Sequence, residues 1–187
     1  VHVEDWPGDI ENILLFNVLL HLVNGTLVAL LVHRMLSLRD VSGSAPAWTA
    51  VGAAALWMLM PLQVSSSLIA VQRMATLSAF FVLAGLLIHL RGIAIEDRRP
   101  ALGVALQALG LVGFTLLAMF TKENGILLPV FALVIQATLL ADRTSPGRLR
   151  LLRTVAGGGT LAIILAYLAY SALRSGGVFG GREFDPL

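Results

Sequence analysis

The sequence contains no cysteine and few charged residues. The absence of cysteine excludes disulfides, thiolate metal sites and cysteine nucleophiles. Only 13% of the residues are charged, about half of the roughly 25% that soluble globular domains carry. Such a chain lacks the charge to cover a water-facing surface, which disfavours a soluble enzyme. Lysine occurs once, at Lys122.

Apolar residues make up 57% of the chain, and the mean hydropathy is +0.86. This apolar content excludes a disordered chain. A bilayer core about 30 Å thick requires about 20 apolar residues of helix. The sequence therefore predicts an all-α, polytopic membrane helical bundle of about six transmembrane helices. The six apolar segments are Ile13–Leu36, Ala47–Met60, Leu68–Leu90, Ala101–Phe120, Gly125–Ala141 and Thr154–Leu173.

The second segment, Ala47–Met60, is short and ends at Pro61, so a re-entrant segment is the alternative to a crossing. The distribution of cations favours a crossing. With the N-terminus outside and six crossings, the inner loops hold nine of the 13 cations and the outer parts hold four. Without that crossing the two sides hold six and seven, and the positive-inside bias disappears.

This topology divides the chain into an outer-loop remnant (1–12), a transmembrane helical domain (13–173) and an outer tail (174–187). The sequence pI of about 9.7 then reflects arginines that face anionic lipid headgroups at the cytoplasmic surface. Membrane lipid is thus the expected partner of the basic residues, and nucleic acid is not.

Three polar residues share one face of the first segment. Asn17, His21 and Asn24 follow the spacing i, i+4, i+7, so they are expected to point into the bundle, away from lipid. Two interpretations stay open, namely hydrogen bonds between helices or the wall of a substrate cavity. The other histidines are scattered, with His33 and His89 placed at the cytoplasmic end, and no metal site is predicted.

Two further groups of polar residues fall at the predicted outer side. Gln72 and Arg73 begin the third segment, where Arg73 is either a snorkelling side chain or part of an anion clamp. Lys122 lies in a turn so short that the flanking helices must form a tight antiparallel hairpin. Glu123 either neutralises Lys122 in an exposed pair or orients it toward the same anion as Arg73.

The residues before the first segment are acidic, namely Glu4, Asp5, Asp9 and Glu11. A carboxylate at an outer membrane mouth is a candidate general base, and ordinary acidic composition is the alternative. In the fourth segment Gly103, Gly110 and Gly113 permit close helix contact.

Four short stretches resemble motifs of one family, and they occur in the same order as in that family. Residues 17–25 resemble the second-helix motif of GT-C-fold membrane glycosyltransferases related to the TMTC-type protein O-mannosyltransferases, whose bacterial relatives often carry tetratricopeptide repeats. Residues 57–65 resemble their W…HPLQVS stretch, 71–92 their VQRM…YLRGR helix, and 121–129 their (S/T)KENGxLLP turn. Met60 stands where the family has histidine.

The resemblance implies a multi-pass enzyme, here in the bacterial inner membrane, that takes a sugar from a polyprenyl-phosphate donor. In that scheme Arg73, Lys122 and Gln72 bind the donor phosphate, and Asp5 or Glu4 is the remnant of the catalytic acidic loop. The supporting residues are Glu123, Asn124, His21, Asn17 and Gln63. The family's first helix would precede Asn17, so the chain is expected to match helices two to seven.

The expected partners are the lipid-linked sugar, membrane lipid, and a protein acceptor or other membrane subunits. No resident cofactor is assigned, and the need for a divalent metal stays open. The alternative function is a non-catalytic scaffold subunit derived from this family. In that case the small residues of the fourth segment and the tail from Phe179 to Leu187 would be its contact surfaces.

Overall fold

Helices that alternate in direction account for nearly all of the structure that can be described. The computed structural model describes residues 6–39, 41–61, 73–139 and 169–170. The chain divides into two units, Val1–Thr144 and Ser145–Leu187. The elements, all in the first unit, are α1 (Trp6–Leu38), α2 (Ala45–Leu59), α4 (Arg73–Ile95), α5 (Pro100–Ala108), the π-helical turn η3 (Leu109–Gly113), α6 (Phe114–Thr121), the 3₁₀ turn η4 (Glu123–Leu127) and α7 (Leu128–Leu139). The all-α prediction is confirmed for these residues.

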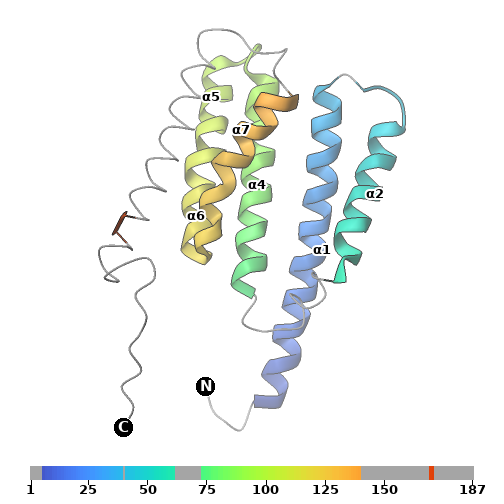
Figure 1. Ribbon diagram of the computed structural model, residues 1–187, viewed down its shortest axis with the longest axis vertical. Helices are drawn as coiled ribbons and strands as arrows, with labels where there is room; N and C mark the ends of the chain where they lie inside the picture. The colour runs from blue at the N-terminus through green and yellow to red at the C-terminus, as the bar shows by residue number, and fades with distance from the viewer. Residues whose placement is uncertain (1–5, 40, 62–72, 140–168, 171–187) are drawn as a thin grey trace. The chain divides into compact units, whose positions relative to one another are not determined.

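Figure 1 shows α1, α2, α4, the α5–α6 pair and α7 running alternately up and down the first unit. Contacts between side chain and backbone fix this arrangement. His21 of α1 lies 3.3 Å from the backbone oxygen of Met58, at the end of α2. Asn24, one turn further along α1, donates to the backbone oxygen of Thr76, near the start of α4. The end of α2 and the start of α4 therefore lie at the same level of α1.

Three helical stretches are long and apolar enough to cross a membrane: Leu14–Leu38, Arg73–Ile95 and Pro100–Thr121. The 15 residues of α2 extend roughly 22 Å, less than the bilayer core of about 30 Å. The stretch Glu123–Leu139 is also shorter than a full span. The sixth predicted segment lies outside the described residues, except for the helical pair 169–170.

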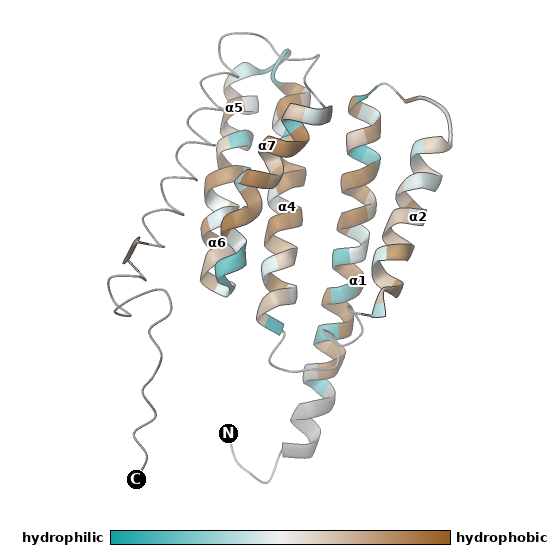
Figure 2. Cartoon of the chain, viewed as in Figure 1, coloured by the Kyte–Doolittle hydropathy of each residue, from teal (hydrophilic) through white to brown (hydrophobic). Residues whose placement is uncertain are grey.

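The first unit turns apolar side chains outward and polar side chains inward. Leu56 is 71% exposed and Phe120 is 87% exposed, whereas Asn17 and Asn24 are completely buried. Figure 2 shows brown, hydrophobic residues along much of α1, α4 and α7. This is the reverse of a water-soluble domain and is the distribution expected where lipid surrounds the helices, because lipid cannot hydrogen-bond polar groups.

Small residues bring α4 into close contact with the α5–α6 pair. A Cβ added to Gly85 would lie 2.8 Å from the backbone oxygen of Gly110, and one added to Gly92 would lie 2.6 Å from that of Gly103. Ser78 continues the row by donating to the backbone oxygen of Ala118 at 3.2 Å. Close packing by Gly103 and Gly110 was predicted and is confirmed.

The π-helical turn η3 keeps this row in register. On α4 the contact residues Ser78, Gly85 and Gly92 repeat every seven residues. On the partner, Gly103 and Gly110 are also seven apart, but Gly110 and Ala118 are eight apart. A π-turn inserts one extra residue into a helix, and η3 begins at Leu109. The insertion returns Ala118 to the face that contacts α4.

Several helix boundaries differ from the sequence-based expectations. The first helix begins at Trp6, seven residues before the expected start of the first segment at Ile13. Pro7 is compatible with this start, because proline is tolerated in the first turn. The same argument corrects the fifth segment, whose α-helix begins at Leu128 and not at Gly125. Pro129 therefore lies in the first turn of α7, where its missing N–H is not needed.

The third segment also continues further than expected, to Ile95 instead of Leu90. Arg91 does not end the helix, because arginine is a good helix former, and Gly92 is held against α5. His89 lies inside α4 and is only 2% exposed.

Candidate functional site

Arg73 and Lys122, the two cations predicted to bind the donor phosphate, lie at the same end of the first unit. The bond between Ser78 and Ala118 sets the level of α4 against α6. Arg73 comes five residues before Ser78, about 7.5 Å along the axis, and Lys122 comes four residues after Ala118, about 6 Å along it. Because the two helices are antiparallel, both displacements lead to the same end. Both side chains are exposed.

Lys122 is held by a compact turn. Its backbone is extended, with φ −160° and ψ 144°, and its N–H donates to the oxygen of Ala118 at 2.9 Å. The N–H of Gly125 then donates to the oxygen of Lys122 at 3.0 Å. Gly125 packs on the backbone of Ala118, leaving no space for a side chain. The predicted tight hairpin is confirmed, with Glu123 and Asn124 exposed in η4.

Large apolar side chains accompany both cations. Met74, next to Arg73, is 66% exposed, and Phe120, two residues before Lys122, is 87% exposed. This end of the unit therefore presents positive charge beside uncovered apolar surface. Such a combination suits an amphiphile that has an anionic head and a hydrocarbon tail.

The polar face of α1 points into the bundle, as predicted. Asn17 and Asn24 are fully buried, and His21 is half-buried with its ring stacked on Trp57 at 5.1 Å between centroids. Asn24 Nδ2 donates to the backbone oxygen of Thr76 at 2.9 Å. These contacts match the interpretation in which the face forms hydrogen bonds between helices. The Asn24 bond also fixes the first turn of α4 and therefore the position of Arg73.

The remaining predicted site residues cannot be placed. Glu4, Asp5, Gln63 and Gln72 lie outside the described residues. In the described part of the chain, no group of three His, Asp or Glu side chains is arranged to hold a metal ion.

A buried polar cluster joins α4, α5 and α7, and sequence reasoning missed it. His89 and Gln136, both buried, are hydrogen-bonded through their Nε2 atoms. Gln107 is 1% exposed and donates to Glu96 Oε2 at 2.9 Å. Gln107 Oε1 has no hydrogen-bond partner. The sequence did contain a signal for this cluster. Gln107 and Gln136 are isolated polar residues within apolar segments, and such residues usually face the interior of a helical bundle.

Two of the small residues of the fourth segment, which was offered as a scaffold contact surface, are already used within the chain. Gly103 lies against Gly92 and Glu96, and Gly110 lies against Gly85 and His89. Neither glycine is therefore available to a second protein in this arrangement. The predicted tail contact, from Phe179 to Leu187, lies outside the described residues.

Comparisons of the chain with protein-family models, with curated proteins and with solved structures give no match.

Proposed function

We propose that this chain is part of a GT-C-like integral membrane glycosyltransferase that takes a sugar from a polyprenyl-phosphate donor and transfers it to an acceptor hydroxyl. The motif resemblance supplies the reaction class. The observation that supports the site is the shared end of Arg73 and Lys122 beside the exposed side chains of Met74 and Phe120. The two cations would bind the donor phosphate, and the apolar side chains would contact the prenyl chain.

The reaction is a displacement at the anomeric carbon of the sugar. The acceptor oxygen forms a bond to this carbon while the bond from the carbon to the phosphate oxygen breaks. The acceptor proton passes to a carboxylate, for which Asp5 or Glu4 is the candidate. Negative charge grows on the departing polyprenyl phosphate, and Arg73 and Lys122 would stabilise it more strongly in the transition state than in the ground state.

The other residues are assigned supporting roles. Gln72 would hydrogen-bond a phosphate oxygen or the sugar, and Gln63 would add a polar group to the same mouth. Asn124 and Glu123 lie beside Lys122 in the turn, where Glu123 would orient it. His21 would support the site through its contacts with Trp57 and Met58 of α2, and Asn17 would support it as a buried residue one turn earlier on the same face of α1.

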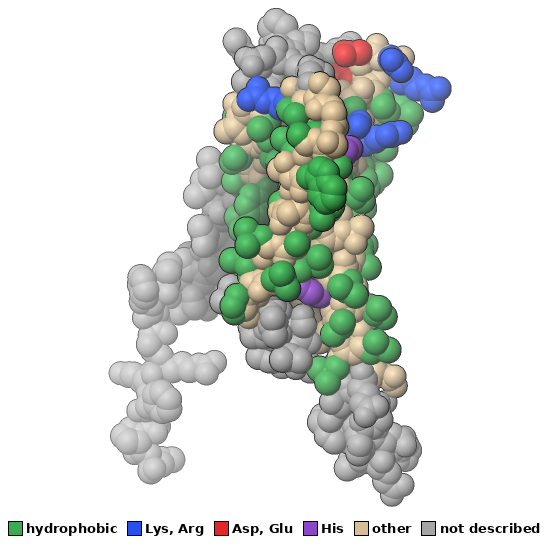
Figure 3. All heavy atoms as spheres, turned by 90° about the vertical axis from the view of Figure 1, so that its right-hand side faces the viewer, with side chains coloured by type: hydrophobic (Ala, Val, Ile, Leu, Met, Phe, Trp, Pro, Cys, Tyr) green, Lys and Arg blue, Asp and Glu red, His purple; other side chains and the backbone are tan. Residues whose placement is uncertain are grey.

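The proposed topology has six crossings with the N-terminus outside, in a bacterial inner membrane. Support comes from the distribution of basic residues over the two ends of the first unit. Five arginines lie in the last turns of α1 and α4 or directly after them, namely Arg34, Arg39, Arg91, Arg98 and Arg99. Figure 3 shows basic side chains gathered at that end. The positive-inside rule assigns that end to the cytoplasm and the end with Arg73 and Lys122 to the outer side.

The test is donor binding and sugar transfer by the full chain in detergent micelles. The probes are undecaprenyl phosphate for binding and radiolabelled undecaprenyl-phosphate mannose for transfer. Arg73→Ala and Lys122→Ala should each weaken binding at least about tenfold, because a charge-assisted hydrogen bond contributes about 1.5–3 kcal/mol. Transfer should be abolished in both variants.

Arg98→Ala is the matched control, because it removes one exposed cation from the opposite end. Its binding should equal that of the unmodified chain. Near-normal binding by both site variants, or equal losses in all three variants, would defeat the assignment.

A further inference from the structure

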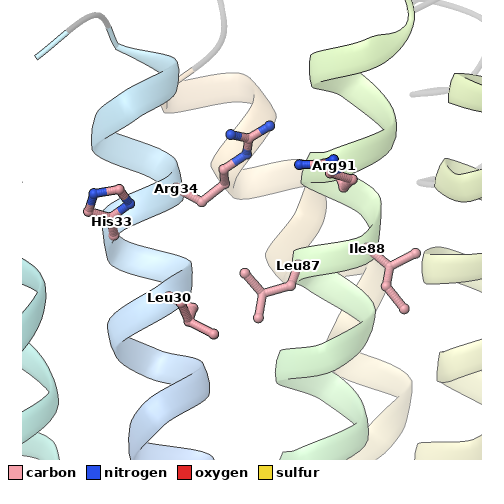
Figure 4. Close-up of a pocket in the computed structure, with 6 residues that line it drawn as sticks. All are labelled: Leu30, His33, Arg34, Leu87, Ile88 and Arg91. Atoms are coloured by element: carbon pink, nitrogen blue, oxygen red, sulfur yellow. The ribbon is translucent and has the colours of Figure 1, made fainter. Parts of the chain in front are cut away.

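A groove between α1 and α4 lies at the basic end of the first unit, away from Arg73 and Lys122. Its volume is about 310 Å³. It is lined by Leu30, His33 and Arg34 of α1 and by Leu87, Ile88 and Arg91 of α4. Figure 4 shows the Arg34 side chain reaching from α1 toward Arg91 on α4.

Charge and hydrophobicity are separated along this groove. The basic residues Arg34 and Arg91 are nearer the ends of their helices, and the apolar residues Leu30, Leu87 and Ile88 lie about one turn deeper. None of the lining residues is acidic. Two guanidinium groups from facing helices thus share one mouth without a lining carboxylate, and an anion there would reduce their mutual repulsion.

The walls of the groove are held in place by packing on the side toward the helix ends. Leu38 and Leu90 form a buried cluster, against which Met35 of α1 and Ile93 of α4 also pack. Packed residues stand directly beside lining residues in the sequence: Met35 follows Arg34 on α1, and Leu90 precedes Arg91 on α4. The separation of α1 from α4 beside Arg34 and Arg91 is therefore supported by apolar packing within the chain.

We infer that this groove binds an anionic glycerophospholipid. Its phosphate lies between Arg34 and Arg91, and the start of one acyl chain lies along Leu30, Leu87 and Ile88. Basic pockets between membrane helices are the sites at which such headgroups bind, and the planar guanidinium matches phosphate oxygens two at a time. Both helices finish at this end, so their backbone carbonyls disfavour an anion. The two arginines must therefore supply the attraction.

The experiment measures lipid retention by the full chain, purified in micelles, by native mass spectrometry. Dioleoyl phosphatidylglycerol is the probe, and dioleoyl phosphatidylcholine is the comparison lipid with the same chains and no net charge. The unmodified chain should retain phosphatidylglycerol preferentially. The pair Arg34→Gln and Arg91→Gln should reduce its apparent affinity at least about tenfold, since each surface cation contributes about 1 kcal/mol.

The matched control is the pair Arg98→Gln and Arg99→Gln, which removes the same charge from exposed residues near the same end. It should change retention less than about twofold, because neither residue lines the groove. A second variant, Ile88→Trp, keeps every charge and fills the apolar part, and it should also release phosphatidylglycerol. Circular dichroism confirms that each variant remains helical.

Three results would overturn the inference. Equal losses in the two arginine pairs would show attraction by general charge and not by the groove. Equal retention of the two lipids would exclude selection for a net negative headgroup. Displacement of phosphatidylglycerol by millimolar inorganic phosphate would identify a free-phosphate site without a role for the acyl chain.

Discussion

The two sides of α4 form very different contacts. Toward the α5–α6 pair, a row of small residues brings the backbones together, as at Gly85 and Gly110. Toward α1, a buried hydrogen bond from Asn24 holds the start of α4, the Leu38–Leu90 cluster packs near its end, and a groove opens near Arg91. Helices in lipid gain no hydrophobic force toward each other and rely on close packing and hydrogen bonds. The side toward α5 and α6 is therefore the tight side, with backbones in contact, and the side toward α1 is the open side, which leaves room for the proposed lipid.

The largest expected effect is on the tight side. Gly110→Ala should lower the free energy of unfolding by about 3 kcal/mol, the upper part of the range for overpacking. The added Cβ would lie 2.6 Å from the oxygen of Gly85 and 2.8 Å from the nitrogen of His89, both backbone atoms. The measurement is unfolding in mixed micelles with increasing dodecyl sulfate.

Gly52→Ala is its matched control, since nothing lies within 4 Å of a Cβ added there. It should leave stability unchanged or raise it by up to about 1 kcal/mol, because alanine is the better helix former. If both alanine variants unfold alike, the close contact with Gly85 does not hold the helices together.

The buried pair of His89 and Gln136 should have the next largest effect. His89→Leu leaves the Gln136 amide buried and without its partner, which costs about 2 kcal/mol. Gln136→Leu should have a similar effect. The double variant should recover most of the loss, because no polar group then remains unpaired. A double-mutant cycle on unfolding free energies measures the coupling, and strict additivity would argue against this bond.

A smaller effect is expected on the open side. Asn24→Leu removes the bond to Thr76, and buried hydrogen bonds between membrane helices contribute about 0.6 kcal/mol on average. Thr26→Val is the control, because the Thr26 hydroxyl is exposed and bonds only to Leu22 in its own helix. Unfolding under the conditions used above compares the two. A larger loss for Thr26→Val would contradict the account of this contact.

The smallest effect is expected from deleting Val112, which is 62% exposed in η3. The deletion removes the extra residue of the π-turn, so Gly110 and Ala118 take the seven-residue spacing found on α4. Deleting Val82 from α4 instead breaks that spacing. Thermal unfolding should show little change for the first deletion and a large decrease for the second. Similar decreases would refute the role given to η3.

Much of the fold could be predicted from local patterns. Hydropathy located the long helices, the short interval between Phe120 and Gly125 predicted the hairpin, and helical periodicity predicted the burial of Asn17 and Asn24. These features depend on residues close together in sequence. Arg73 and Lys122 were placed at one end from the alternation of segments alone.

Contacts that depend on helix register could not be predicted in this way. The pairing of His89 with Gln136 requires α4 and α7 at one level, and that level follows from the glycine row and the extra residue in η3. The groove beside Arg34 and Arg91 likewise depends on the separation of α1 from α4. Hydropathy and charge counts give neither the relative level of two helices nor the distance between them.

The central claim is that Arg73 and Lys122 share one face of the membrane, opposite to the basic end. The chain has no cysteine, so single cysteines can be labelled without background. We expect a membrane-impermeant maleimide to label Met74→Cys and Glu123→Cys on intact cells and to label Asp97→Cys only after permeabilisation. Labelling of only one of the first two on intact cells would place the cations on opposite faces and contradict the account.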